Sequence, residues 1–139
     1  MRTIKWGVMG TAGIFENCTA PGMQQADNCK MYAIAGRSME KAEQFKEKYG
    51  FEKAYGSYEE LLADPQVEAV YIPLPNTMHY EWAIRALQSG KHVLCEKPLA
   101  PSEAQAREMF AAAEENHVYL MEAFAYQHSP YIAAVDREI

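Results

Sequence analysis

The sequence predicts an α/β protein built on a doubly wound parallel sheet. Two observations lead to this fold class. Short apolar runs alternate along the chain with longer segments of helical periodicity, and glycines follow the first apolar run directly. Strand and helix in alternation are typical of parallel strands joined by right-handed crossovers, with helices on both faces of the sheet.

The composition limits the function classes. A chain of 139 residues suits one domain, and its net charge of -6 argues against nucleic-acid or anionic-membrane partners. The cysteines, Cys18, Cys29 and Cys95, form neither a CxxC motif nor a zinc pattern, so we expect reduced thiols and no metal site. The start resembles no signal peptide, and no uncharged apolar run reaches 18 residues, so we expect a cytoplasmic protein.

Short apolar runs predict the strands. Strict alternation of apolar and polar residues is missing from them, as it is from strands that are covered on both faces. The predicted strands are residues 4–9, 31–35, 69–72, 92–95 and 118–121, with a shorter strand at 53–55.

Helical patterns fill the intervals between the strands. Ser57-Tyr-Glu-Glu60 and Ser102-Glu-Ala-Gln105 read as capping boxes that open two of the helices, and Gly90 is placed to end another. The predicted helices are residues 40–49, a short helix from 57, 78–89, 102–116 and 129–139.

Ligands of such sheets bind outside the carboxyl ends of the strands. The first strand is followed by Gly10-Thr-Ala-Gly13-Ile-Phe15, an incomplete dinucleotide fingerprint in which Ala12 and Phe15 replace the second and third glycines. We expect the turn to accept a slightly displaced pyrophosphate and Phe15 to turn away from the helix–strand contact. A glycine-rich turn without a ligand is the alternative.

The second predicted strand is followed by Gly36, Arg37, Ser38 and, one turn later, Lys41. An NAD site usually has an acidic residue here for the ribose hydroxyls, and this chain has none. A guanidinium and a hydroxyl suit a 2′-phosphate instead, so we favour NADP and leave NAD as the alternative. A solvated helix start capped by Ser38 would give the same sequence.

Two prolines follow the third predicted strand. They direct the chain out of the sheet, and Asn76 or Thr77 then caps the next helix. We expect Asn76 and His79 to face the crevice and contact the cofactor. The residues expected at this strand end are Pro73, Leu74, Pro75, Asn76 and His79.

The fourth predicted strand stops at Glu96-Lys97-Pro98. A lysine at this edge suits a substrate hydroxyl or a nicotinamide ribose, and Pro98 fixes the turn. A cis Lys97-Pro98 bond is an option that X-Pro sequences allow. A solvated charged turn is the alternative interpretation of the motif alone.

These strand ends together resemble the glucose–fructose oxidoreductase/inositol dehydrogenase (Gfo/Idh/MocA) family, in its dihydrodiol dehydrogenase-like branch. The resemblance covers almost the whole chain. It is carried by WGVMGTAGI, AGRSMEKAEQFKEKYG, the segment from YGSYEELL to HVLCEKPL, and LMEAFAYQHSP. The EKP motif with its PxPNxxH partner is specific, whereas the glycine turn is not.

The resemblance implies site residues and a division of labour. Gly10, Thr11, Ala12, Gly13 and Ile14 would hold the pyrophosphate, and Gly36, Arg37 and Lys41 would lie at the adenosine ribose. Pro73 to Asn76 and His79 would line the dinucleotide path. Glu96, Lys97, Glu122 and Ala123 would lie at the nicotinamide end, with Lys97 as the catalytic or substrate-orienting lysine.

The resemblance also implies what lies outside these residues. Residues 1–123 would form the cofactor domain, and 124–139 would begin the connection to an absent C-terminal domain that binds a sugar- or polyol-like substrate and mediates homo-oligomers. Gln127-His128-Ser129-Pro130 departs from the family's Arg-Phe-His-Pro. The expected function is an NADP-dependent oxidoreductase acting on CH–OH groups, of which this fragment alone is inactive. The alternative is a stand-alone dinucleotide-binding or sensor module without catalysis.

Overall fold

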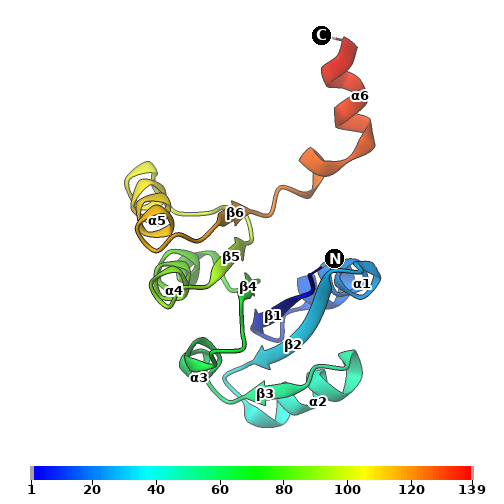
Figure 1. Cartoon of the computed structure of the whole chain (residues 1–139), viewed down its shortest axis with the longest axis vertical. Coiled ribbons are helices and arrows are strands. Elements are labelled where there is room, and N and C mark those ends of the chain that lie inside the picture. Colours follow the sequence, from blue (N-terminus) through cyan, green and yellow to red (C-terminus); the bar gives the residue numbers. More distant parts are fainter. Residues whose placement is uncertain (1, 139) are drawn as a thin grey trace.

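The computed structural model describes residues 2–138 and confirms the doubly wound parallel sheet (Figure 1). Six parallel strands have the spatial order β3-β2-β1-β4-β5-β6. The strands are β1 (Ile4–Met9), β2 (Cys29–Ala35), β3 (Lys53–Tyr55), β4 (Ala69–Ile72), β5 (His92–Cys95) and β6 (Leu120–Glu122). The strand order reverses between β1 and β4, which is where sheets of this kind open a ligand crevice.

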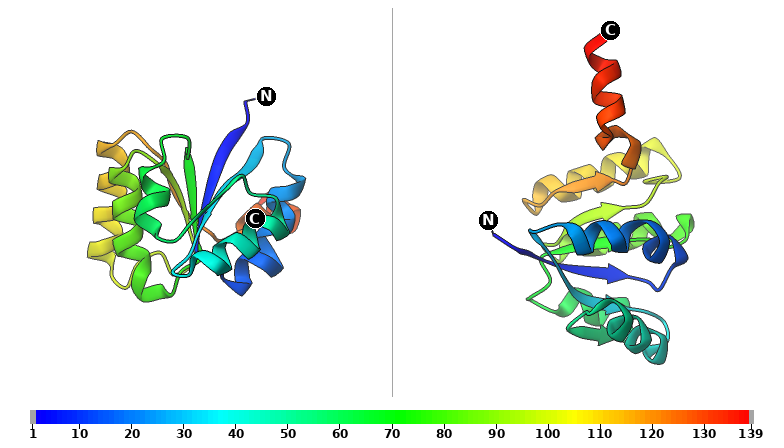
Figure 2. Two further views of the ribbon diagram at one scale, coloured as in Figure 1. Left: turned by 90° about the horizontal axis from the view of Figure 1, so that it is seen from below. Right: turned by 90° about the vertical axis from the view of Figure 1, so that its right-hand side faces the viewer.

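Helices cover both faces of the sheet, as Figure 2 shows in its left view. A π-helix, η1 (Phe15–Thr19), leads into α1 (Ala20–Gln25), which lies with α2 (Met39–Tyr49) on one face. The other face carries α3 (Tyr58–Ala63), α4 (Asn76–Gln88) and α5 (Glu103–Glu115). Within residues 2–138, no helix covers β5 and β6 on the α1 face.

Two hydrophobic clusters lie on opposite faces of the sheet, and each strand contributes alternate side chains to them. In β4, Val70 and Ile72 belong to the cluster under α3, α4 and α5, whereas Tyr71 between them belongs to the cluster under η1 and α2. Side chains alternate between the two faces of a strand, so a wholly apolar run serves both clusters. This explains the continuous apolar runs from which the strands were predicted.

The helix ends confirm most of the capping predictions. Ser57 and Ser102 accept the backbone N–H of Glu60 (3.2 Å) and Gln105 (3.3 Å). Gly90, at φ +72°, follows the end of α4. The expectation of an Asn76 or Thr77 cap is wrong, because α4 already begins at Asn76, after Pro75, and has no side-chain cap.

The chain leaves the sheet after β6. The short 3-10 helix η2 (Ala125–His128) and α6 (Pro130–Glu138) have no buried residues, and α6 extends away from the sheet (Figures 1 and 2). The segment 15–25, for which no helix was predicted from the sequence, forms η1 and α1.

Candidate functional site

The carboxyl ends of the parallel strands bring the predicted site residues to one edge of the sheet. Residues 10–14 follow β1, 36–41 follow β2, 73–79 follow β4, 96–97 follow β5, and Ala123 follows β6. Because β1 lies between β2 and β4, the glycine turn is flanked by the Arg37 and Pro73 loops. The topology thus forms a row from Arg37 to Lys97.

The glycine turn requires Gly10 at its first position. Gly10 has φ +120°, and its N–H donates to Ala35 O at 2.8 Å. A Cβ on Gly10 would also lie 3.1 Å from Leu74 Cδ2. L-residues rarely adopt this backbone conformation, so the first position of the turn, which is itself buried, is occupied by a residue without a side chain. The close backbone approach that a pyrophosphate needs is therefore compatible with the residues present.

Phe15 does not turn away from the helix–strand contact, and this expectation is corrected. Its side chain is fully buried in the cluster under η1 and α2. The ring centroid lies 5.2 Å from that of Tyr49 and 5.9 Å from that of Phe51. Neighbouring aromatic side chains accommodate the large residue where the fingerprint has glycine for close helix–strand packing.

The loop after β2 places cationic side chains beside the glycine turn. Gly36 is buried, and a Cβ on it would lie 3.5 Å from Thr11 Cγ2. Arg37 and Lys41 are exposed, while Ser38 is the N-cap of α2 and accepts the Lys41 N–H at 3.4 Å. The capping alternative for Ser38 is therefore present in the structure, together with an exposed guanidinium next to it.

The loop after β4 is divided between buried and exposed residues. Pro73 and Leu74 are buried, whereas Pro75 and Asn76 are exposed. His79 differs from the expectation that it faces the crevice, because it is fully buried. Its Nδ1 lies 2.7 Å from Pro98 O and its Nε2 lies 2.7 Å from Leu74 O. Both ring nitrogens thus face backbone carbonyl oxygens, and neither is available to a ligand.

A hydrogen-bond chain fixes the carboxylate after β5. Thr19 Oγ1 donates to Tyr71 Oη at 2.9 Å, and Tyr71 Oη donates to Glu96 Oε1 at 2.7 Å. Burial raises the pKa of Tyr71, so its hydroxyl keeps the proton that it donates. Lys97 follows with an exposed side chain, and the Lys97-Pro98 bond is cis.

Glu122 and Ala123 join the end of β6 to this motif. The Leu99 N–H donates to Glu122 Oε1 at 2.7 Å, and the Ala123 N–H donates to Cys95 O at 2.8 Å. One oxygen of the Glu122 carboxylate is therefore bound to the backbone of the turn that carries Lys97.

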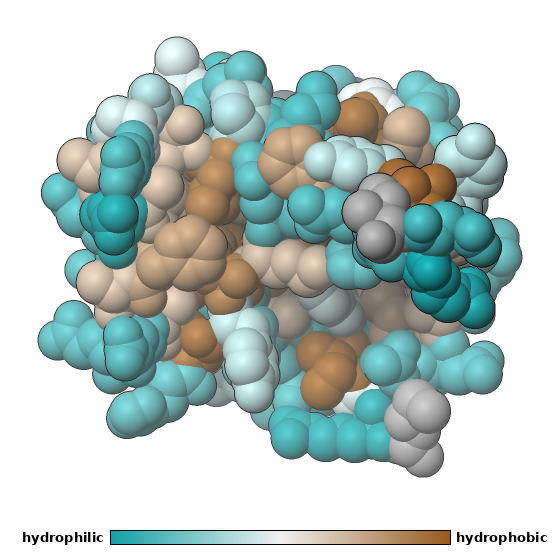
Figure 3. Space-filling model, turned by 90° about the horizontal axis from the view of Figure 1, so that it is seen from above, coloured by the Kyte–Doolittle hydropathy of each residue, from teal (hydrophilic) through white to brown (hydrophobic). Residues whose placement is uncertain are grey.

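The open half of the sheet forms a pocket of about 800 Å³. Trp6, Tyr71, Leu94 and Met121 line it from four strands on the α1 face. The residues predicted for the site that also line it are Ile14, Glu96, Lys97, Glu122 and Ala123. Brown apolar patches are visible on the face of the molecule that is seen from above (Figure 3).

The sequence reasoning missed Tyr71, Thr19 and the apolar residues of this pocket. A usable signal existed for Tyr71, because it alternates with Val70 and Ile72 and its side chain must therefore lie on the opposite face of β4 from theirs. No comparable signal pointed to Thr19, since it reaches Tyr71 from a π-helix that the periodicity did not indicate.

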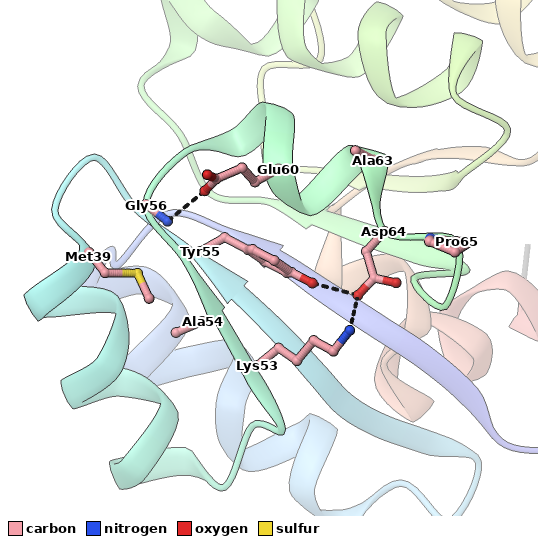
Figure 4. Close-up of a pocket in the computed structure, with 9 residues that line it drawn as sticks. All are labelled: Met39, Lys53, Ala54, Tyr55, Gly56, Glu60, Ala63, Asp64 and Pro65. Atoms are coloured by element: carbon pink, nitrogen blue, oxygen red, sulfur yellow. Dashed lines mark hydrogen bonds and ion pairs between the residues drawn. The ribbon is translucent and has the colours of Figure 1, made fainter.

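A second pocket, of about 700 Å³, lies along the edge strand β3 (Figure 4). Its polar groups are engaged within the protein: Asp64 accepts hydrogen bonds from Lys53 Nζ (3.0 Å) and Tyr55 Oη (2.7 Å), and Glu60 accepts the Gly56 N–H (3.1 Å). Burial alone would raise the pKa of Asp64, but the hydrogen bonds from Tyr55, the Gln66 amide and Lys53 outweigh it and lower the pKa to about 2. This cluster stabilises the edge of the sheet and lies apart from the row of strand ends that forms the crevice.

Among residues 2–138, no group of histidine, cysteine and acidic side chains could hold a metal ion. None of the described helices is both long and apolar enough to cross a membrane.

The chain is similar in sequence to known dehydrogenases. A D-xylose 1-dehydrogenase (NADP(+)) of Haloferax volcanii is 44% identical over 90% of the chain, which spans 38% of that protein. A trans-1,2-dihydrobenzene-1,2-diol dehydrogenase of Xenopus laevis is 43% identical over 86% of the chain, which spans 37% of that protein. The chain therefore spans less than half the length of these relatives.

Solved structures of reductases are similar to this chain as well. A 3-ketoreductase from Actinomadura kijaniata, in complex with TDP-benzene and NADP, superposes with a TM-score of 0.93 at 40% identity. The superposition covers 98% of this chain and 43% of the reductase chain. Residues 4–124 also match the model of an oxidoreductase family with an NAD-binding Rossmann fold. With the glycine turn, the EKP motif and the six-stranded sheet all in place, the chain belongs to the Gfo/Idh/MocA oxidoreductase family.

Proposed function

We propose that this chain is the NADP-binding domain of an oxidoreductase that acts on the CH–OH group of a sugar, polyol or related alcohol. The observation that carries the proposal is the row of strand ends from Arg37 through Gly10 to Lys97 along one edge of the sheet. Relatives named as NADP-dependent dehydrogenases, and a reductase structure with NADP bound, support it. Since the relatives are more than twice as long, the substrate class concerns the whole protein.

The residues of the row divide the cofactor between them. The exposed turn at Gly13 and Ile14, which precedes η1, approaches the pyrophosphate and binds it through its backbone N–H groups. Arg37 binds the 2′-phosphate of the adenosine ribose, because its guanidinium is exposed and no acidic side chain occupies residues 36–38. Ser38 and Lys41, which lie in the same helix turn, add to the local attraction for an anion.

Lys97 carries the proton chemistry. The bound nicotinamide would supply or accept the hydride. At the rim of the pocket, the exposed Lys97 ammonium donates a hydrogen bond to the substrate oxygen and gives that oxygen its proton when a carbonyl is reduced; when an alcohol is oxidised, the neutral Lys97 amine accepts the hydroxyl proton. Glu96, held by Tyr71, adds a fixed negative charge beside it, and the apolar walls keep water away from the reacting carbon.

Calorimetric titration with NADPH and NADH tests the cofactor assignment. We expect tighter binding of NADPH, and we expect Arg37→Ala to weaken NADPH binding by about tenfold to a hundredfold, the cost of a hydrogen-bonded charge. NADH binding should stay within about twofold. Arg107→Ala is the matched control, because Arg107 is an exposed arginine of α5 that pairs with Glu103 and lies at no strand end of the row. Tighter binding of NADH, unchanged by Arg37→Ala, would refute the NADP assignment.

We make three further proposals, which concern the domain boundary, the oligomeric state and the location of the whole protein. We propose that residues 1–123 form the cofactor domain and that 124–139 begin the connection to a substrate domain, since the family match ends at residue 124 and η2 and α6 bury no side chain. A homo-oligomer assembled through that domain and a cytoplasmic location are proposed for the whole protein. Sedimentation of the full-length protein beside this chain tests the oligomer: only the longer protein should associate.

A further inference from the structure

One peptide group in the EKP turn is held at both of its ends. The carbonyl oxygen of Pro98 lies 2.7 Å from His79 Nδ1, and the N–H of Leu99 donates to Glu122 Oε1 at 2.7 Å. These two atoms belong to the same unit, the Pro98–Leu99 peptide. Its partners come from different elements, His79 from α4 and Glu122 from β6.

The geometry of a trans peptide makes this double contact restrictive. The carbonyl oxygen and the amide hydrogen point in opposite directions in one rigid plane. A single hydrogen bond leaves the plane free to tilt about it, whereas bonds at both ends fix its orientation. The contacts are partly sheltered from water, because His79 is fully buried and Leu99 is 8% exposed, whereas Glu122 is half-buried and Pro98 is exposed. Hydrogen bonds to a carboxylate are stronger than hydrogen bonds between neutral groups, so the bond between the Leu99 N–H and Glu122 is the stronger kind.

The held peptide is separated from Lys97 only by Pro98. The proline ring fixes its own φ, so the ψ of Pro98 is the one soft torsion between the Pro98–Leu99 plane and the Lys97–Pro98 peptide. Glu96, on the other side of Lys97, is held by Tyr71. Lys97 is thus an exposed side chain on a backbone that is fixed from both directions.

We propose that His79 and Glu122 are positioning residues that together clamp the Pro98–Leu99 peptide and thereby set the place of Lys97 at the nicotinamide end. This assignment rests on the proposed NADP function and replaces the expectation that both side chains contact the cofactor. The clamp acts as a unit, so losing either partner frees the peptide.

Substitutions can keep or remove each end of the clamp. Glu122→Gln retains an acceptor for the Leu99 N–H, and Glu122→Ala removes it. Asn has its amide nitrogen near the place of the histidine Nδ1, so His79→Asn retains the Pro98 contact. Gln has its amide nitrogen near the place of Nε2, so His79→Gln retains only the Leu74 contact. His92→Gln is the matched control, because His92 lies at the opposite edge of the sheet and accepts the Tyr119 N–H.

The readout is the ratio of affinities for NADPH and for adenosine 2′,5′-bisphosphate, which lacks the nicotinamide half. We expect Glu122→Ala and His79→Gln each to weaken NADPH binding about tenfold and to leave the bisphosphate within about twofold. His79→Asn, Glu122→Gln and His92→Gln should stay near wild type. The double variant of Glu122→Ala and His79→Gln should bind NADPH no worse than about the weaker single variant, because both release one peptide.

Three outcomes would overturn the clamp. They are wild-type NADPH affinity in both end-removing variants, equal losses for NADPH and the bisphosphate, or fully additive losses in the double variant. If wild type itself binds no NADPH, the proposed function fails, and hydrogen exchange of the Leu99 amide decides the clamp alone. Faster exchange in Glu122→Ala and His79→Gln, but not in His92→Gln, supports it, and unchanged exchange refutes it.

Discussion

Tyr71→Phe removes one hydroxyl from the centre of the site and little else. Tyr71 is 1% exposed, and its ring packs 6.4 Å, centroid to centroid, from Phe15, so a phenylalanine retains the packing. The hydroxyl donates to Glu96 Oε1 at 2.7 Å and accepts from Thr19 at 2.9 Å. The substitution therefore isolates the hydrogen bonds from the shape of the core.

The magnitude follows from the type of bond that is lost. A hydrogen bond to a charged group contributes about 1.5 to 3 kcal/mol. Glu96 is half-buried, so water replaces part of the loss, and we expect the free energy of unfolding to fall by about 1 to 2 kcal/mol. With a urea m-value of about 2 kcal/mol/M, this lowers the denaturation midpoint by about 0.5 to 1 M.

A double-mutant cycle with Glu96→Ala tests whether the carboxylate is the partner that matters. We expect a coupling energy of about 1 kcal/mol between the two positions. Tyr80→Phe is the matched control: Tyr80 also donates to a carboxylate, that of Glu108, but at the surface, so its urea midpoint should not change. A coupling below about 0.3 kcal/mol would show that Tyr71 does not hold Glu96, and the reasoning about the site would be refuted.

Three further predictions concern stability and reactivity. The pKa of Asp64 is lowered from 3.8 to about 2, so the stabilisation that its carboxylate provides is present above about pH 4 and is lost as the pH falls through 2. In urea titrations, the fall in unfolding free energy between these pH values should be about 1 kcal/mol smaller for Asp64→Asn than for the wild type, a figure that includes solvent screening. Gly10 has φ +120°, so Gly10→Ala should lower the free energy of unfolding by about 1 to 3 kcal/mol. Gly22 lies inside α1, and a Cβ added to it would meet no atom within 4 Å, so Gly22→Ala should leave the free energy of unfolding unchanged or raise it. Cys18 is exposed, and burial raises the pKa of Cys95 to about 12, so a thiol reagent should modify Cys18 first; equal rates would contradict the packing of β5.

The fold could be predicted because its signals are local. Predicted runs of three to six residues, capping boxes and a terminating glycine each act within a few positions of the sequence, and the structure confirms all six predicted strands with small shifts of their ends. The η1–α1 segment could not be predicted in the same way. Its Pro21 and Gly22 weaken the helical pattern, and Phe15 at the third fingerprint position is accommodated by aromatic residues of α2 and the loop after it.

The side chains of the site were harder to assign than its position. Topology alone places strand ends along one edge, so the location follows from the order of elements. Whether a polar side chain enters the crevice depends on partners far away in the sequence. His79 is bound to a backbone oxygen 19 residues away, and Glu122 to an amide 23 residues away. Any type of residue can supply a backbone partner, so no sequence motif could have indicated these contacts.

The site residues consequently fall into two groups that respond differently to substitution. Arg37, Lys41 and Lys97 are exposed, so their removal should change ligand binding or chemistry and leave the free energy of unfolding nearly unchanged. His79 and Glu122 are already bound to the backbone, so their removal should change stability and binding together, and in proportion to the hydrogen bonds lost. Plotting the change in NADPH affinity against the change in unfolding free energy for these five positions separates the two groups. If all five fell on one line, the distinction between contact and positioning residues would have no physical basis in this protein.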